Sequence, residues 1–335
     1  TIQLGRLDRT AADGGVQVAT RAARLQPALA QAIVREALGS RGDAPLQMAD
    51  LERGLLLVNE LPGVSATASL ERGSAPGTSR LVVQVDEGSL LAGAVVADNG
   101  GNRFTGAARL TGTLALLDPT GRGDSAQLQL SAAERSSALN VAYSLPLGAG
   151  GWRGGVNLNT LRYRLGEELA ALDARGTAHG LGLSASLAVH RTRDSMLTLT
   201  ADLDHRQLAD DSLGQAMARK RSNALTLGLN GSRQDSGAGG GMTQGSLSLG
   251  AGRIDLGGVA AALAADQGGP RVQGGFAKLG LTLVRLQPLS AGTALFVGLR
   301  GQLAGGNLDS SERLQLGGAG GVRAYPAGEG SVDEG

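Results

Sequence analysis

Few side chains in this sequence could carry acid–base, nucleophilic or metal chemistry. The three histidines, His179, His190 and His205, fall on different segments and lack the close spacing of metal ligands. The chain has no cysteine, which excludes disulfides, thiol nucleophiles and thiolate metal sites. The sequence therefore predicts neither a metal site nor a bound cofactor.

One group of polar residues stays as a candidate for catalysis. Asp204-His205 precedes Asp210-Asp211 in what we expect to be a single long loop, Asp204–Ser222. Such a group could act as the acid/base pair of an outer-membrane protease. A solvated loop without a catalytic role explains the same residues, and we expect a protein that is not an enzyme.

The charge balance excludes further classes. The 31 Lys and Arg against 30 Asp and Glu leave a formal net charge of +1, and 2% aromatic residues offer few platforms for base stacking. No glycine-rich phosphate loop stands between a strand and a helix. We therefore expect neither nucleic acid nor a small-molecule substrate. The run Arg219-Lys220-Arg221 is either an ordinary charged loop or a contact for anionic lipopolysaccharide.

Apolar and polar residues alternate in stretch after stretch from about Ser89 to Gly301. Between Leu181 and Val189, every second residue is Leu, Ala or Val, and Gly, Ser or Ala stands between them. A period of two places the apolar side chains on one face of a β-strand and the small or polar ones on the other. A sheet built from such strands can sit in a membrane only as a closed barrel, with lipid outside and water inside.

About eleven such strands can be counted. Each has close to the roughly 9–11 residues that a tilted strand needs to cross a bilayer. The connections His190–Asp194 and Gln287–Ala291 are short, whereas Asp204–Ser222 and Gly252–Gly274 are long, an asymmetry typical of bacterial outer-membrane barrels. The candidate strands are residues 89–97, 106–116, 124–133, 138–146, 153–163, 177–190, 195–203, 223–232, 243–251, 276–286 and 292–301.

Two other architectures share the alternation. A soluble β-sandwich buries the apolar face in its own core, and a secreted adhesin built as a β-solenoid is also repetitive and rich in glycine. Strand length and loop asymmetry favour the barrel. The aromatic girdles of such barrels are missing here, so we expect Leu and Ala to form the lipid face.

Residues 1–88 have a different character. The helical period dominates, with Pro27 suited to a first helical turn and Gly39 to a C-terminal cap. The order strand, helix, helix, strand, strand predicts a small α+β domain with one core. The strands are expected at residues 2–7, 64–70 and 79–86 and the helices at residues 27–39 and 50–61.

Residues 302–335 are rich in glycine and contain Val322-Arg323-Ala324-Tyr325. They fit a flexible surface loop. They also fit a loop folded back into a pore, where glycines allow tight folding while Arg and Tyr reach a wall. Barrels of this kind normally have an even number of strands, and lipid does not tolerate an open sheet edge. We therefore expect the natural protein to continue beyond the last residue.

Four motifs, in this order, resemble one family. Residues 50–64 are similar to the second polypeptide-transport-associated (POTRA) domain of the two-partner secretion transporters (TpsB, haemolysin secretion/activation type), which are related to the barrel-assembly insertase. Residues 98–106 resemble the family's first hairpin, and residues 118–124 its first periplasmic turn. Val322-Arg323-Ala324-Tyr325 resembles the Val-Arg-Gly-Tyr/Phe motif of its lid loop. The resemblance extends over nearly the whole chain.

The resemblance implies an α+β POTRA domain followed by a transmembrane antiparallel β-barrel. Residues 1–88 would be the second of two POTRA domains, residues 89–301 the first eleven or so of 16 strands, and residues 302–335 the lid loop. Five more strands would follow, and a first POTRA domain and a plug helix would precede. Arg323 would anchor the lid to an acidic group in the missing strands, with Tyr325 packing beside it. Ala324 replaces the family's glycine, so we expect a differently shaped loop tip.

The implied function is transport across the bacterial outer membrane. The POTRA domain, in the periplasm, would capture a large β-helical exoprotein (TpsA-like) by strand addition at Val64, Ala66, Ala68 and Leu70, although these positions also suit a core. The exoprotein would cross the barrel unfolded. Outer-membrane lipid and lipopolysaccharide would surround the barrel. An insertase that assembles other barrels and a surface β-protein or adhesin without transport activity remain alternatives.

Overall fold

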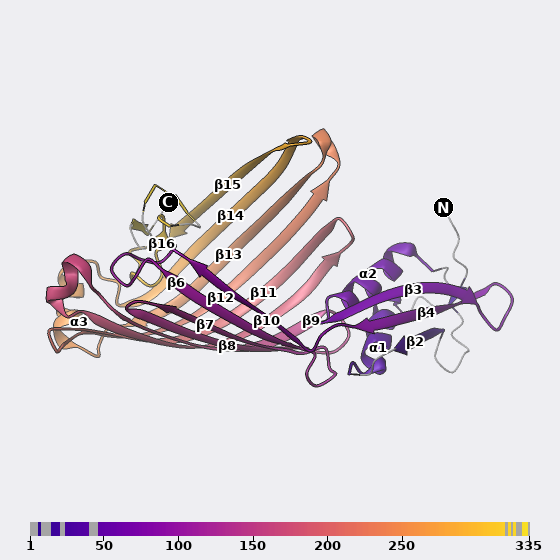
Figure 1. The fold of residues 1–335 in the computed structure, drawn as a ribbon, viewed down its shortest axis with the longest axis horizontal. Helices are drawn as coiled ribbons and strands as arrows, with labels where there is room; N and C mark the ends of the chain where they lie inside the picture. The colour runs from indigo at the N-terminus through magenta and orange to yellow at the C-terminus, as the bar shows by residue number, and fades with distance from the viewer. Residues whose placement is uncertain are drawn as a thin grey trace.

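The computed structural model of the chain describes residues 6–7, 15–20, 24–39, 46–318, 321–322, 324–325 and 330–333. A small N-terminal α+β unit is followed by a large curved antiparallel sheet (Figure 1). In the described part of the chain, no helix is both long and apolar enough to cross a membrane.

The N-terminal unit is built around one central strand. Strand β4 pairs in parallel with β1 and β2 and, along its other edge, antiparallel with β3. The two helices and two following strands match the expected ranges, whereas β2 was not predicted and residues 2–5 of the expected first strand lie outside the described residues. The elements are β1 (Arg6–Leu7), β2 (Val16–Thr20), α1 (Pro27–Leu38), α2 (Met48–Asn59), β3 (Val64–Arg72) and β4 (Thr78–Glu87).

The apolar stripes of the two helices explain why this unit folds. Ile33 and Val34 on α1 and Val58 on α2 are almost fully buried against Val83 and Val85 of β4. Alternate residues of β4 face the helices, which is the period expected of a strand with one covered face. The unit therefore has one compact apolar core, as the sequence predicts.

The large sheet is a meander of eleven strands in which every neighbour in sequence is also a neighbour in space. The first and last strands, β5 and β15, each pair on one side only among the described strands, so the sheet is open. Its strands are β5 (Leu91–Asp98), β6 (Arg109–Leu117), β7 (Ser125–Ala133), β8 (Ser136–Pro146), β9 (Trp152–Arg164), β10 (Arg175–Arg191), β11 (Ser195–Ser212), β12 (Gln215–Asp235), β13 (Gly241–Asp255), β14 (Gly274–Ser290) and β15 (Thr293–Ala304).

Leucines share one face of this sheet and stay exposed. Leu183, Leu203 and Leu225 are in register on β10, β11 and β12, and they are 52%, 52% and 46% exposed. The residues between them in sequence, such as Ser184 and Asp202, point to the opposite face. The sheet therefore has one apolar face and one polar face, as the alternation predicts.

The prediction of a long loop over Asp204–Ser222 is wrong. Strands β11 and β12 remain paired as far as Ser212 and Gln215 and turn over two residues, Leu213 and Gly214, which both have positive φ. The alternation ends before the strands do, because both faces of the sheet become polar beyond the leucines. A period-two signal therefore reports the part of a strand that has one apolar and one polar face rather than its whole length.

Shorter elements complete the chain. The connection between β13 and β14 is long, as expected, and contains α3 (Ala260–Gly268). Two 3₁₀ turns, Glu167–Leu172 and Gly237–Gly239, lie in the β9–β10 and β12–β13 connections. Beyond β15, the two-residue strands β16 (Leu314–Gln315) and β17 (Ser331–Val332) pair with each other.

Candidate functional site

Among the basic side chains on the polar face of the sheet, three from different strands contact the segment that follows β15. These are Arg206 on β11, Lys220 on β12 and Lys278 on β14. Each lies an odd number of positions along its strand from an outward leucine, so its side chain points to the face opposite to the leucines. This face is where the chain returns after β15.

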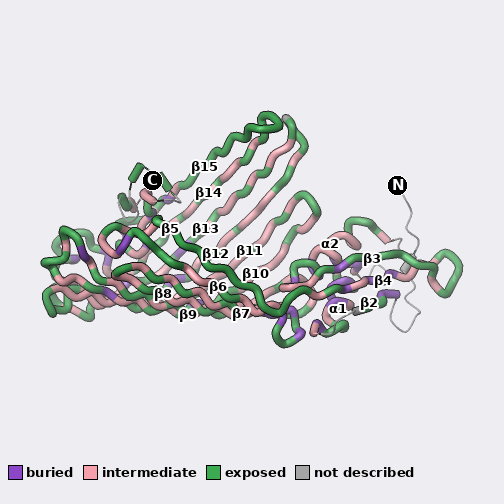
Figure 2. The backbone as a smooth tube through the Cα atoms, viewed as in Figure 1, coloured by how far each residue is buried: buried purple, intermediate pink, exposed green. Residues whose placement is uncertain are grey.

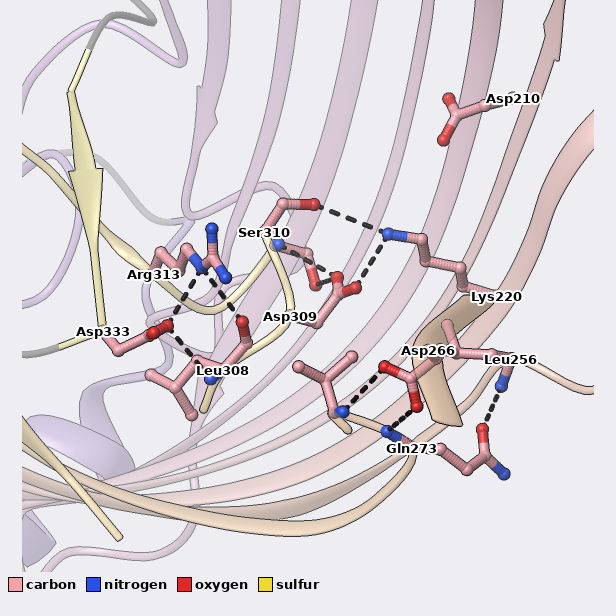
Figure 3. A network of polar contacts seen from close by, with 12 residues as sticks. Asp210, Lys220, Leu256, Asp266, Gln273, Leu308, Asp309, Ser310, Arg313 and Asp333 are labelled. Atoms are coloured by element: carbon pink, nitrogen blue, oxygen red, sulfur yellow. Dashed lines mark hydrogen bonds and ion pairs between the residues drawn. The ribbon is translucent and has the colours of Figure 1, made fainter. Parts of the chain in front are cut away.

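Two buried carboxylates in residues 305–313 bind these basic side chains. Lys220 Nζ lies 2.7 Å from Asp309 Oδ2 (Figure 3), and Lys278 Nζ lies 2.7 Å from Glu312 Oε2. Arg206 Nη1 lies 3.3 Å from Glu312 Oε1. Asp309 is 6% exposed and Glu312 3%, so each carboxylate depends on its basic partners. We call these five residues the carboxylate clamp.

A further ion pair, between Arg313 and Asp333, closes the segment beyond the clamp on itself. Arg313 Nε donates to Asp333 Oδ1 over 2.9 Å and to the Leu308 carbonyl over 3.0 Å, and the Leu308 N–H donates to Asp333 Oδ1 over 3.0 Å (Figure 3). Gln302 on β15 donates its side-chain N–H to the Asp333 carbonyl over 2.9 Å. The described residues between Leu308 and Asp333 therefore belong to a loop whose two ends, Leu308 and Asp333, are held together against the sheet.

The expected lid motif lies within this loop. Val322 donates its N–H to the Leu316 carbonyl over 2.7 Å, and Tyr325 donates its N–H to the Val322 carbonyl over 3.0 Å. Val322 also lines a hollow of about 450 Å³ together with Phe296 of β15. The side chains of Val322 and Tyr325 are 50% and 56% exposed, Ala324 is exposed beside them, and Arg323 lies outside the described residues.

Strand β3 presents a backbone edge that no described strand covers. Gly73 donates its N–H to the Thr78 carbonyl over 3.0 Å, which fixes the alternation along the hairpin. Because bonded and non-bonded residues alternate in an antiparallel pair, the even-numbered residues of β3 direct their backbone groups away from β4. These residues include the four that the sequence singled out.

The side chain of Asn59, the last residue of α2, occupies part of this edge. Asn59 Nδ2 donates to the Ala66 carbonyl over 2.9 Å, and the Ala66 N–H donates to Asn59 Oδ1 over 2.8 Å. The Val64 N–H is bonded to the preceding turn over 3.2 Å. Val64, Ala66 and Ala68 point their side chains toward the core, and Leu70 is 38% exposed. The open part of the edge therefore begins at Ala68 and includes Leu70.

The turn between β6 and β7, residues 118–124, docks on the N-terminal unit. Gln26 donates its N–H to the Gly121 carbonyl over 2.8 Å. A side chain at Gly121, whose φ is +75°, would overlap the backbone of Arg24, so the close approach requires glycine. The predicted turn is thus a contact surface for the N-terminal unit.

Two buried carboxylates shape this turn. Burial raises the pKa of Asp118 even though the Gly123 N–H donates to it over 2.7 Å. Burial acts in the same direction on Asp124, but hydrogen bonds from the Tyr143 hydroxyl, at 2.8 Å, and from Thr120 outweigh it and lower the pKa of Asp124. The turn therefore favours one ionised and one more readily protonated carboxyl.

Helix α2 contacts a second turn of the sheet. Arg53 donates Nη2 to the Ala188 carbonyl over 2.9 Å, and Arg191 forms an ion pair with Glu60. Trp152, at the start of β9, lines a hollow beside Leu57 of α2. The N-terminal unit is therefore attached to the sheet through several strand connections at one end.

The structure separates the candidate acid/base group. His205 lies on the leucine-bearing face of β11, where its Nδ1 is 2.8 Å from Asn223 Oδ1, whereas Asp204 and Asp210 point to the polar face. Asp210 accepts a hydrogen bond from the Tyr163 hydroxyl over 2.7 Å. Among the residues that the structure describes, no three His, Asp or Glu side chains are grouped to hold a metal ion.

Comparison with known proteins assigns the chain to a family. The sequence pattern of the haemolysin secretion/activation protein ShlB/FhaC/HecB matches residues 77–335. The chain belongs to this family. Its members include outer-membrane transporters of two-partner secretion, in agreement with the resemblance found in the sequence.

Two curated relatives support the assignment. The heme/hemopexin transporter protein HuxB of Haemophilus influenzae (strain 86-028NP) is 31% identical over 301 residues, which are 85% of this chain and 51% of HuxB. The outer membrane transporter CdiB of Dickeya dadantii (strain 3937) is 27% identical over 308 residues, 88% of this chain and 53% of CdiB. The chain therefore spans about half the length of the curated relatives it matches, and these relatives are transporters rather than enzymes.

Solved structures share the fold. CdiB from Escherichia coli superposes with a TM-score of 0.75 at 20% identity, over 96% of this chain and 60% of that chain. BamA from Haemophilus ducreyi lacking POTRA domains 1-3 gives a TM-score of 0.57 at 14% identity, over 93% and 60%. The large antiparallel sheet is thus of the kind found in these barrels.

Sequence reasoning located the motif-bearing loop but missed the carboxylate clamp. Asp309 and Glu312 were placed in the expected lid loop without a role of their own, and Lys220 in a charged loop with a lipopolysaccharide contact as the alternative. One signal was available in the sequence. Successive side chains of a strand point to opposite faces, so a strand over this run would place Lys220 on the face opposite to Arg219 and Arg221. Contact between residues about 90 positions apart could not be found from local patterns.

Proposed function

We propose that this chain is part of an outer-membrane transporter of two-partner secretion, which moves a large unfolded exoprotein to the cell surface. One observation carries the proposal. The sheet has an exposed leucine face, suited to lipid, and a polar face on which a loop with the family's motif is held by buried ion pairs. This is the arrangement of a water-filled barrel with an internal lid.

The domains follow from this assignment. Residues 1–88 are a POTRA domain in the periplasm, residues 89–301 are the first eleven strands of a barrel of 16, and residues 302–335 are the lid loop. The open edges of β5 and β15 support further strands, since lipid does not tolerate unpaired edges. The attachment of α2 to the sheet supports a fixed position for the POTRA domain at the periplasmic mouth.

The exoprotein is recognised by its backbone at the edge of β3. A β-rich client in extended form can add a strand to an uncovered edge. Val64 and Ala66 contribute less than Ala68 and Leu70, because their outward N–H groups already have partners within the unit. Recognition therefore centres on the half of β3 that lies toward the β3–β4 turn.

Arg323 and Tyr325 hold the lid closed against the inner wall, while the clamp holds the base of the same loop. The likeness to BamA reflects a shared fold and leaves the insertase as the alternative function. HuxB is described as a heme/hemopexin transporter, and CdiB as an outer membrane transporter. For this chain, the proposed client is a secreted exoprotein encoded by a neighbouring gene.

Secretion of the neighbouring exoprotein into the medium tests the proposal, with the complete gene deleted and then restored. Leu70→Pro removes one outward N–H without touching the bonds to β4, and Leu70→Ala is the matched control that keeps this N–H. We expect Leu70→Pro and Arg323→Ala to reduce secretion, whereas Leu70→Ala preserves it, all at equal outer-membrane abundance. Secretion that survives deletion of the gene would refute the transporter.

A further inference from the structure

Six arginines gather on the leucine-bearing face at the end of the sheet that is far from the N-terminal unit. Strand parity places them there, since each is an even number of residues from an exposed leucine or valine of the same face. We call this set the arginine band; it consists of Arg162, Arg164, Arg175, Arg219, Arg221 and Arg253.

The band begins where the leucines end. Leu158 and Leu181 are paired in register on β9 and β10, and the next outward pairs toward the far end are Thr160 with His179 and Arg162 with Thr177. Arg162 is therefore four residues beyond Leu158, roughly 13 Å along a tilted strand. Such a position corresponds to the headgroup level of a bilayer whose acyl chains cover the leucines.

Most of these arginines make no close ion pair with a described residue, although Asp255 is the register partner of Arg221. Arg164 lies 2.6 Å from Asp173 and Arg219 lies 2.6 Å from Asp211. In the described part of the chain, the other four (Arg162, Arg175, Arg221 and Arg253) have no ion pair within 4.0 Å, and all four are exposed. An arginine that only stabilises the fold would form an ion pair within the protein. Among the described residues these four form none, so their guanidinium groups can contact an external anion.

The surface has the space for an anionic group. A hollow of about 490 Å³ lies on it, lined by His179, Arg219, Arg221 and Asp255. On the leucine-bearing face of these strands, the aspartates beyond the leucines are Asp211 and Asp255, fewer than the arginines, so the band is positively charged. Guanidinium groups bind phosphate oxygens in pairs of parallel hydrogen bonds, which suits them to phosphate monoesters.

We propose that the arginine band binds the phosphate groups of lipopolysaccharide in the outer leaflet. The continuity with the leucine belt selects a lipid over a free phosphate, because acyl chains on the leucines hold the headgroup at the level of the arginines. The inference rests on the proposed placement in the outer membrane, and it assigns a lipid site that transport of the exoprotein does not require.

Binding of lipid A to the purified complete transporter in detergent tests the site. The variant Arg221→Gln/Arg253→Gln removes two exposed arginines of the band. Arg233→Gln is the matched control, because Arg233 lies on the same face of β12 at the opposite end of the strand. We expect the double variant to bind bisphosphorylated lipid A at least about tenfold more weakly than the wild type, and the control to bind it unchanged.

Two further arms identify the source of the phosphate. Monophosphorylated lipid A should bind more weakly than the bisphosphorylated form, and inorganic phosphate at the same concentration should not displace it. Equal affinity of the double variant and the wild type, or full displacement by inorganic phosphate, would overturn the lipid site. Both results are obtained without an exoprotein, so they are independent of the secretion assay that tests the transporter.

Discussion

The N-terminal unit and the large sheet use the same apolar residue types in opposite ways. In the unit, Val58 and Val83 are 0% exposed, whereas Leu183 and Leu203 of the sheet are 52% exposed. Figure 2 shows buried residues gathered in the unit and alternating intermediate and exposed residues along the strands of the sheet. The unit encloses its apolar side chains in a core, whereas the sheet leaves them exposed on one face.

The difference shows that the two regions are stabilised by different interactions. The unit excludes water from a packed apolar core. The sheet has a continuous hydrogen-bonded ladder, and its polar face contacts the returning chain through ion pairs such as Lys220 with Asp309. Substitutions that truncate an apolar side chain should therefore act on the unit, and those that remove a charge should act on the polar face.

The largest effect is expected from truncation in the core of the unit. Leu81→Ala removes a side chain that is 1% exposed and should lower the free energy of unfolding of the unit by about 2–5 kcal/mol. Leu227→Ala on β12 removes one that is 49% exposed and should change stability far less. Urea-dependent protease resistance of the complete protein in detergent measures both. Equal losses in the two variants would contradict the comparison.

A smaller and more local effect is expected at the carboxylate clamp. Glu312→Gln removes the charge that Arg206 and Lys278 share, at a cost of about 1–3 kcal/mol for hydrogen bonds to charged groups. Opening of residues 305–318 should become about 5- to 150-fold more frequent, which deuterium exchange of peptides from this segment measures. Ser310→Ala is the control, because Ser310 is exposed and its hydroxyl accepts only a long hydrogen bond, 3.5 Å, from Lys220 Nζ. Unchanged exchange in Glu312→Gln would exclude the clamp.

The smallest effect concerns the contact between the two regions. The pKa of Asp124 is lowered, so its contribution to docking is present above about pH 4 and is lost as the pH falls through its folded pKa. The pKa of Asp118 is raised, so its ionisation costs stability as the pH rises from about 4 through that value. Asp118→Asn should therefore stabilise docking at neutral pH. On acidification, docking of the variant should weaken only through protonation of Asp124.

Fluorescence of Trp152, the only tryptophan, reports this docking because Trp152 lies beside α2. Asn tolerates the positive φ of residue 118, which makes the substitution conservative. A variant that is less stable than the wild type at pH 7 would show that the Asp118 charge stabilises the turn.

Local patterns predicted the elements that carry their apolar side chains on one face. The strands from β5 to β15 and the helices α1 and α2 were found because their periods of 2 and 3.6 follow that face. The outer parts of β11 and β12 were missed because both of their faces are polar. The edge of β3 was proposed from its position, but the partial cover by Asn59 depends on where α2 ends.

The sequence by itself determined the two-faced sheet, the α+β unit before it and the family motifs, because each is written in neighbouring residues or in short repeats. Only the tertiary structure decided which charges meet. Lys220 binds Asp309 on one face while Arg219 and Arg221, its neighbours in sequence, join the arginine band on the other. The reason is that strand parity separates adjacent residues, while the path of the chain after β15 brings distant ones together.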